Sequence, residues 1–199
     1  MIVTKVEAVT KTKFKVYLDG RFAFVLYKAE LPRFGISEEA ELSEEVYAQI
    51  RKDVVLKRAK LRAMHLLTDM ARTEAGLREK LVQGMYPEDI VEEALAYVRS
   101  FGYLNDLRYA ENFIESRKDS KSRKEIYALL CKKGVSAEQI DRAFASCYPD
   151  EGEQEAIHHI IRKKKMDISD ASREEIQKFC GYLARKGFRY EEIMRAVQQ

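Results

Sequence analysis

Lysine and arginine side chains gather in three clusters along this chain. Each cluster could form charge-assisted hydrogen bonds with phosphates or carboxylates, which is the chemistry of binding and not of bond cleavage. One basic cluster usually marks a solvated helix face, but clusters on a repeated scaffold could line up as one long positive surface. The candidate partner-binding residues are Lys57, Arg58, Lys60 and Arg62; Lys121, Arg123 and Lys124; and Arg162, Lys163, Lys164 and Lys165. The last cluster ends a predicted helix, where cations are favourable without any partner.

The sequence contains no constellation typical of a catalytic or cofactor site. It has no glycine-rich phosphate loop, no nucleophile-elbow motif and no cysteine pair at zinc-finger spacing. His158 and His159 are adjacent, so on a helix their side chains point about 100° apart, which is a poor arrangement for holding one metal ion. We therefore expect no enzyme activity, no catalytic residue, no metal and no cofactor.

The basic clusters lie on segments that repeat. Three times a helical pattern ends at a glycine, an apolar residue follows at once, and a glutamate and an isoleucine come four and six residues after the glycine. The glycines, Gly84, Gly134 and Gly187, are 50 and 53 residues apart. A left-handed glycine ends a helix and lets the next apolar residue pack on the last turn, and the glutamate suits the start of a new helix. The pattern predicts tandem three-helix units.

The N-terminal part has the pattern of strands. Apolar residues alternate from Phe14 to Leu18 and from Phe22 to Leu26, with Asp19-Gly20 between the two runs. Asp-Gly at this position indicates a hairpin whose turn residues both have positive φ. With a third strand over residues 2–9, we expect a small antiparallel sheet that leans on a helix.

These patterns together predict a mainly α-helical chain with four parts. Residues 1–50 form the β region and an acidic connection, and residues 51–103, 104–149 and 150–199 form three repeats. A long helix over about Asp53–Met70 opens the first repeat. We expect the apolar residues that follow the repeat pattern to form the core, and Tyr103 and Leu104 with them.

Composition bounds the class of protein. The chain has 199 residues, is 46% hydrophobic and carries a net charge of +3, so it can bury a core of its own. It has no apolar run long enough to span a membrane, and its N-terminus lacks the apolar segment of a secretory signal. Three widely spaced cysteines fit a reducing compartment. We expect a cytoplasmic protein with no membrane partner.

Two stretches between residues 66 and 117 form a pair of specific motifs. The first stretch contains Leu66-Leu67-Thr68, Arg72-Thr73-Glu74-Ala75 and Leu77-Arg78-Glu79-Lys80-Leu81. The second contains Phe101-Gly102-Tyr103-Leu104-Asn105-Asp106, Arg108-Tyr109-Ala110, Phe113 and Ser116-Arg117. Together they strongly resemble the signature of the RecX family, bacterial regulators of the RecA recombinase. The chain departs from the family pattern at Thr73, where Ser is usual, at Gly76, where Glu is usual, and at Gly84-Met85-Tyr86, which is shifted against the usual Lys-Gly-Tyr.

The resemblance covers about residues 53–199 and implies an elongated, curved array of three-helix repeats. It implies a non-catalytic protein that binds RecA filaments on DNA and inhibits the recombinase, ATPase and co-protease activities of RecA, and so acts in DNA recombination, DNA repair and the SOS response. Arg72, Glu74 and Arg108 belong to the signature, and we interpret them first as residues that position helices and second as partner contacts.

Two other functions are compatible with the sequence. The basic clusters also fit a nucleic-acid-binding helical repeat protein that acts without RecA, and the repeats fit a scaffold for another protein. Regulation of RecA and binding of nucleic acid do not exclude each other, because the RecA filament contains DNA. We expect a monomer, since a repeat array has no obvious spare interface.

Overall fold

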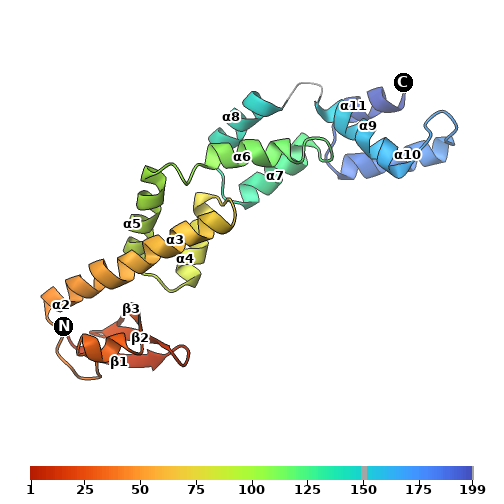
Figure 1. Cartoon of the computed structure of the whole chain (residues 1–199). Helices are drawn as coiled ribbons and strands as arrows, with labels where there is room; N and C mark the ends of the chain where they lie inside the picture. The colour runs from red at the N-terminus through yellow and green to blue at the C-terminus, as the bar shows by residue number, and fades with distance from the viewer. Residues whose placement is uncertain (149–151, 199) are drawn as a thin grey trace. The chain divides into compact units, whose positions relative to one another are not determined.

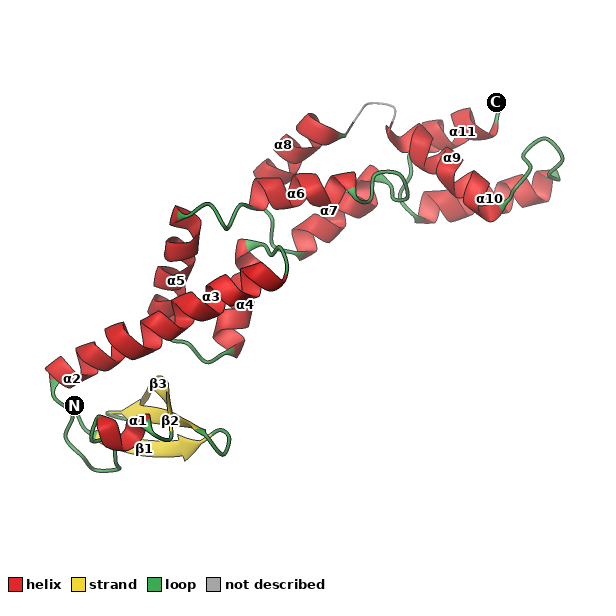
Figure 2. Ribbon diagram, viewed as in Figure 1, coloured by secondary structure: helices red, strands yellow, loops and turns green. Residues whose placement is uncertain are grey.

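The structure is a computed structural model that describes residues 1–148 and 152–198 (Figure 1). The chain forms two compact units, Met1–Leu104 and Asn105–Gln199. The described residues are mainly helical, and a small antiparallel sheet lies at the N-terminus (Figure 2). This architecture confirms the predicted fold class.

The sheet opens the first unit. Its strands are β1 (Val3–Ala8), β2 (Lys13–Leu18) and β3 (Arg21–Tyr27), in the order β1-β2-β3 and antiparallel throughout. Asp19 and Gly20 form the predicted hairpin turn with φ values of 47° and 80°. The face that packs inward carries Val16, Leu18, Phe24 and Leu26, which are all buried.

The helix that follows the sheet is longer than the sequence analysis predicted. After the short α1 (Glu30–Arg33), the helices α2 (Glu44–Gln49), π-helical η1 (Ile50–Leu56) and α3 (Lys57–Asp69) run on without a break, because the residues at both joints keep helical dihedrals. The predicted start at Asp53 is therefore wrong. Ser43 caps the helix by accepting the Val46 N–H at 3.3 Å, and the acidic residues that follow it favour the helix start.

The first three-helix domain consists of α3, α4 (Glu74–Gln83) and α5 (Glu88–Ser100). Its core is continuous with that of the sheet: Leu77, Leu81 and Ile90 belong to the same buried cluster as Val16 and Phe24. The sheet thus leans on helices, as predicted, and shares their hydrophobic stabilisation.

The second unit holds two further three-helix domains. One contains α6 (Asp106–Glu115), α7 (Arg123–Lys132) and α8 (Ala137–Cys147), and the other contains α9 (Gly152–Lys164), α10 (Arg173–Arg185) and α11 (Tyr190–Val197). Each has its own buried cluster, around Ile126 and Leu130 in the first and around Leu183 and Ile193 in the second. The expected boundary between residues 149 and 150 lies outside the described residues.

The turn that ends each middle helix has the same hydrogen bond in all three domains. The backbone N–H of the apolar residue after the turn donates to a buried leucine carbonyl five positions earlier, and the pairs are Tyr86 with Leu81, Val135 with Leu130, and Phe188 with Leu183. Gly134 and Gly187 have φ values of 80° and 87°, which confirms the predicted left-handed turn at these two sites.

The first copy of this turn corrects the prediction for Gly84. Gly84 has a φ of −73° and still continues the helical direction, whereas Met85 takes the left-handed position with a φ of 62°. The turn is therefore displaced by one residue, which agrees with the shifted Gly84-Met85-Tyr86 motif. A side chain at positive φ is strained, so this domain carries a cost that glycine avoids in the other two.

The prediction that Tyr103 is a core residue is wrong. Gly102 has a φ of 70° and turns the chain after α5, so that Leu104 is buried and Tyr103 remains 58% exposed. The motif therefore places one of its two large side chains in the core and leaves the other in solvent.

Candidate partner-binding surfaces

The first basic cluster lies on α3, and its members differ in their surroundings. Lys57 and Arg62 are exposed, whereas Arg58 and Lys60 are half-buried. The ammonium group of Lys60 lies 4.9 Å from the centre of the Tyr97 ring on α5. The cluster is therefore not one uniform solvated face.

Arg58 makes three contacts inside the first unit. Its guanidinium forms an ion pair with Glu30 at 2.6 Å, donates to the Val25 carbonyl at 3.3 Å and lies over the Tyr27 ring at 4.3 Å from the centre. Arg58 and Glu30 keep only 24% and 21% of their side chains exposed. These contacts fasten the helix to the sheet, a role that sequence reasoning missed because Arg58 and Glu30 are 28 residues apart.

The second cluster lies at the N-terminus of α7. Lys121 forms an ion pair with Glu125 one turn later, and the guanidinium of Arg123 lies 4.7 Å from the centre of the Phe144 ring. Lys124 is exposed. Arg123 and Lys124 thus remain accessible, whereas the charge of Lys121 is already balanced.

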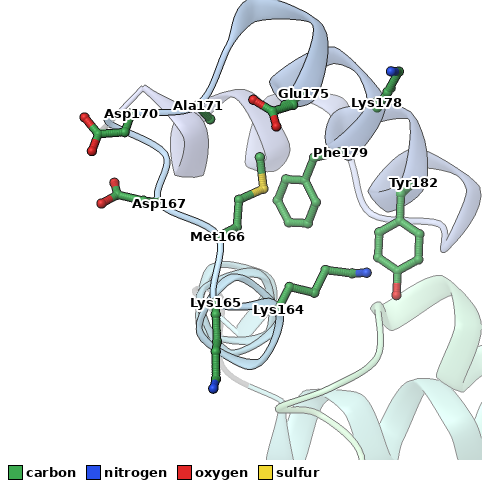
Figure 3. Close-up of a pocket in the computed structure, with 10 residues that line it drawn as sticks. All are labelled: Lys164, Lys165, Met166, Asp167, Asp170, Ala171, Glu175, Lys178, Phe179 and Tyr182. Atoms are coloured by element: carbon green, nitrogen blue, oxygen red, sulfur yellow. The ribbon is translucent and has the colours of Figure 1, made fainter.

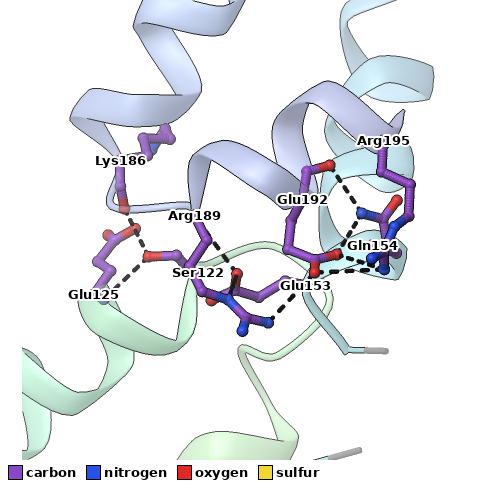
Figure 4. Close-up of polar contacts among 8 residues, drawn as sticks. All are labelled: Ser122, Glu125, Glu153, Gln154, Lys186, Arg189, Glu192 and Arg195. Atoms are coloured by element: carbon purple, nitrogen blue, oxygen red, sulfur yellow. Dashed lines mark hydrogen bonds and ion pairs between the residues drawn. The ribbon is translucent and has the colours of Figure 1, made fainter. Parts of the chain in front are cut away.

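Ser122 links this cluster to the next domain (Figure 4). Its hydroxyl oxygen accepts the Glu125 N–H at 3.1 Å, which caps α7, and the hydroxyl donates to the Lys186 carbonyl at 2.7 Å. Ser122 is fully buried. A Cβ on Gly187 would lie 3.1 Å from the Ser122 oxygen, so this contact requires glycine both for its space and for its positive φ.

One ion pair and hydrogen bonds join α9 to α11 and its N-cap beside this contact, as Figure 4 also shows. Glu153, which is 3% exposed, accepts a hydrogen bond from the Arg189 guanidinium at 3.0 Å. Gln154 donates to the Glu192 carbonyl at 2.8 Å, and Arg195 pairs with the Glu192 carboxylate at 3.4 Å. The hydrogen bond that Arg189 donates to Glu153 raises the pKa of Arg189, which stays charged at any physiological pH.

A groove of about 890 Å³ lies beside Ser122, between the two domains of the second unit. Arg123, Lys124 and Arg189 line it with positive charge, and Tyr148 adds a hydroxyl with no hydrogen-bond partner in the described structure. Burial raises the pKa of Tyr148 to about 12, so its hydroxyl keeps its proton at neutral pH and can donate. Because Glu153 balances Arg189 here, the unpaired cations favour a carboxylate or a phosphate.

The third cluster ends α9, and all four of its members are exposed. Lys164 and Lys165 border a pocket of about 630 Å³ that is also lined by Met166, Phe179 and Tyr182. Figure 3 shows Lys164 extending toward Tyr182, and its ammonium lies 4.5 Å from the ring centre. The carboxylates of the same pocket belong to Asp167, Asp170 and Glu175. The pocket is therefore of mixed charge, and the lysines offer a weaker positive field than the sequence run indicates.

The family-signature residues lie at helix ends. Arg72 donates from its Nε to the Leu66 carbonyl at 3.2 Å, near the end of α3. Glu74 pairs with Arg99 of α5 at 2.7 Å, which ties the start of α4 to the end of α5. Arg108 is exposed on α6. Arg72 and Glu74 thus serve contacts within the first domain.

The described residues contain neither a metal-binding cluster nor a membrane-spanning helix. No group of three or more histidine, cysteine, aspartate or glutamate side chains is arranged to hold a metal ion among them. None of the helices they form has the length and apolar character needed to cross a membrane.

Comparison with known proteins identifies each three-helix domain. Family models for RecX match residues 59–97 as its first three-helix domain, 105–143 as its second and 151–197 as its third. The regulatory protein RecX of Caldanaerobacter subterraneus is 35% identical, over 99% of this chain and 98% of that protein. The regulatory protein RecX of Bacillus velezensis is 28% identical, over 99% of this chain and 76% of that protein.

Solved structures give the same result. A crystal structure of regulatory protein RecX has a TM-score of 0.64 at 25% identity and covers 100% of this chain and 99% of that one. The structure of RecX from Lactobacillus salivarius has a TM-score of 0.60 at 23% identity, covers 72% of this chain and 94% of that one, and supports the fold.

Replacing Arg58 should weaken the first unit. We expect Arg58→Ala to lower the free energy of unfolding by about 1–3 kcal/mol, because Glu30 loses its half-buried partner and Tyr27 loses the cation over its ring. Lys57→Ala is the control, since that side chain is exposed and should change stability by less than about 0.5 kcal/mol. Urea unfolding followed by circular dichroism measures both. Equal losses in the two variants would show that the Arg58 contacts do not stabilise the fold.

Replacing Ser122 should lower the free energy of unfolding more than replacing an ordinary helix cap does. Ser136 caps α8 in the same way and is exposed, so Ser136→Ala should remove only a helix cap. That loss should lower the free energy of unfolding by about 0.5–2 kcal/mol. Ser122→Ala also removes the donor to the Lys186 carbonyl, so we expect a further loss of about 1 kcal/mol or more. Urea unfolding compares the variants, and faster amide hydrogen exchange at Gly187 and Phe188 should accompany only Ser122→Ala. Matching exchange rates in both would contradict the contact.

Proposed function

Because this chain belongs to the RecX family, we propose that it is a non-catalytic regulator that binds RecA filaments on DNA and inhibits the recombinase, ATPase and co-protease activities of RecA. The main support is the extent of the match: a relative named as a regulatory protein aligns with 99% of this chain, and all three RecX domain models are present in order. We propose that it acts in DNA recombination, DNA repair and the SOS response.

The exposed cations and the half-buried Lys60 are the residues we propose for partner contact. Arg58 and Lys121 already form ion pairs within the fold, so we assign them a smaller part in the contact with the partner. The remaining contacts would come from the first cluster, the second cluster and the end of α9, namely Lys57, Lys60 and Arg62; Arg123 and Lys124; and Arg162, Lys163, Lys164 and Lys165. These side chains fit either an acidic protein surface or the phosphates of DNA within the filament.

A second candidate function is nucleic-acid binding without RecA. The groove beside Ser122 favours it, because two unpaired cations and a tyrosine hydroxyl that keeps its proton suit a phosphate. Binding of this kind would weaken steeply as salt is raised, since each phosphate contact releases counterions.

The ATPase activity of RecA on single-stranded DNA separates these functions. We expect the full chain to inhibit it when present at less than one molecule per RecA, at concentrations below those at which it binds the same DNA without RecA. The measurements are ATP hydrolysis and fluorescence anisotropy of the labelled DNA. Salt-sensitive binding to bare DNA without any inhibition would instead establish the second function.

Charge reversal tests the second cluster. We expect Arg123→Glu combined with Lys124→Glu to raise the concentration needed for half-inhibition by about tenfold, through loss of two exposed cations at the partner surface. The variant should fold, since both positions lie in the first turn of α7, where acidic residues are favourable.

A control variant carries the same change of charge elsewhere. Lys11→Glu combined with Arg142→Glu alters two exposed cations outside the clusters and should inhibit like the unmodified chain. Circular dichroism verifies that both variants fold. An equal loss of inhibition in both would point to net charge, and no loss in either would exclude the second cluster as a contact.

A further inference from the structure

Three aromatic rings meet at the C-terminal end of α5, and we call them the aromatic platform: Tyr97, Phe101 and Tyr103. The ring centres of Tyr97 and Phe101 are 5.0 Å apart in an edge-to-face contact. Those of Phe101 and Tyr103 are 5.9 Å apart with nearly parallel planes, at 18° to one another. All three residues belong to the first unit.

The outer two rings of the platform lie in solvent. Phe101 is 57% exposed and Tyr103 is 58% exposed, while their neighbours Val98 and Leu104 fill the core. The fold thus buries the aliphatic residues of this segment and leaves the aromatic ones outside. Adjacent exposed rings are unfavourable in water and commonly mark a binding surface.

Hydrogen bonds order the backbone that carries the platform. Gly102 donates to the Arg99 carbonyl at 2.9 Å, and Tyr103 donates from its backbone N–H to the Val98 carbonyl at 3.2 Å. The positive φ of Gly102 completes this turn. The backbone that carries the rings is therefore fixed before any partner arrives, which lowers the entropy cost of binding.

Positive charge lies beside the rings. Helix α3 packs along α5, and Lys60 of α3 places its ammonium 4.9 Å from the centre of the Tyr97 ring. A cation beside aromatic rings is an arrangement that proteins use to hold single-stranded nucleic acid, with bases on the rings and phosphates on the cations.

We propose that the aromatic platform binds bases of single-stranded nucleic acid by stacking, with Lys60 meeting a phosphate. Stacking uses the exposed rings of Phe101 and Tyr103, which an acidic protein surface would leave unused. A purely apolar protein partner would bury Lys60 without a counter-charge, which is costly. The inference rests on the proposed function only in that a RecA filament contains single-stranded DNA.

The test measures binding of the full chain to a labelled oligothymidylate of about 20 nucleotides, at low salt and without RecA. The variant is Phe101→Leu with Tyr103→Leu, which keeps an apolar surface and removes the aromatic faces. Because one stacked base contributes about 5- to 150-fold in affinity, we expect the Kd to rise about tenfold or more. Binding to a DNA duplex of equal length should not change, since its bases already stack on one another.

Two control variants make the result specific. Tyr190→Leu removes an exposed ring from α11 (Tyr190 is 70% exposed) and should leave the Kd unchanged. Phe101→Tyr with Tyr103→Phe exchanges the two rings, keeps both aromatic faces and should also bind like the unmodified chain. Circular dichroism verifies that each variant folds.

The outcomes separate this inference from the proposed function. An unchanged Kd in the double leucine variant overturns the inference, and if RecA inhibition is then weaker, the platform contacts protein. A raised Kd in that variant, when the unmodified chain fails to inhibit RecA, supports the inference and overturns the proposed function.

Discussion

The turn at the end of each middle helix is the constraint on which the repeats depend. One residue must enter the left-handed region so that the next apolar residue can return to the helix and donate its N–H to a buried leucine carbonyl. That turn leads into the third helix of each domain, which packs against the first two. In the third domain it has an additional role, because the Lys186 carbonyl and Gly187 of the same turn receive Ser122 from the domain before it. Closing one domain and joining two domains thus rely on the same few backbone atoms.

The cationic residues divide into those that stabilise the fold and those that are free to meet a partner. Arg58 contacts Glu30, Val25 and Tyr27, and Lys121, which precedes α7, pairs with Glu125 of that helix. A half-buried arginine with three contacts contributes to stability, whereas an exposed lysine contributes little. The charge runs of the sequence therefore contain more cations than are free to meet a partner.

The elements of the fold can be predicted from neighbouring residues, whereas contacts between residues distant in sequence cannot. The Asp19-Gly20 hairpin and the left-handed glycines at Gly134 and Gly187 followed from neighbouring residues and were confirmed. The long helix starts at Glu44, inside the acidic segment that the sequence predicts to be a connection, because acidic residues also suit a helix start. The Ser122 contact joins residues 64 positions apart, and no periodicity reveals such a pair. The exposure of Tyr103 depends on a turn that directs Leu104 to the core instead.

In the described structure, a hydrogen bond from Ser122 to the Lys186 carbonyl joins the two domains of the second unit, and each domain keeps a separate apolar core. A hydrogen bond exchanges readily with water, so a joint of this kind costs less to open than a shared core does. The first unit is built differently, because its sheet and its three helices share one continuous core. A chain that follows a long filament, as we propose, would gain from this difference. Its first unit would act as a rigid anchor, and the later domains could adjust to the surface at small cost, with the free energy of each new contact offsetting the opening of the Ser122 joint.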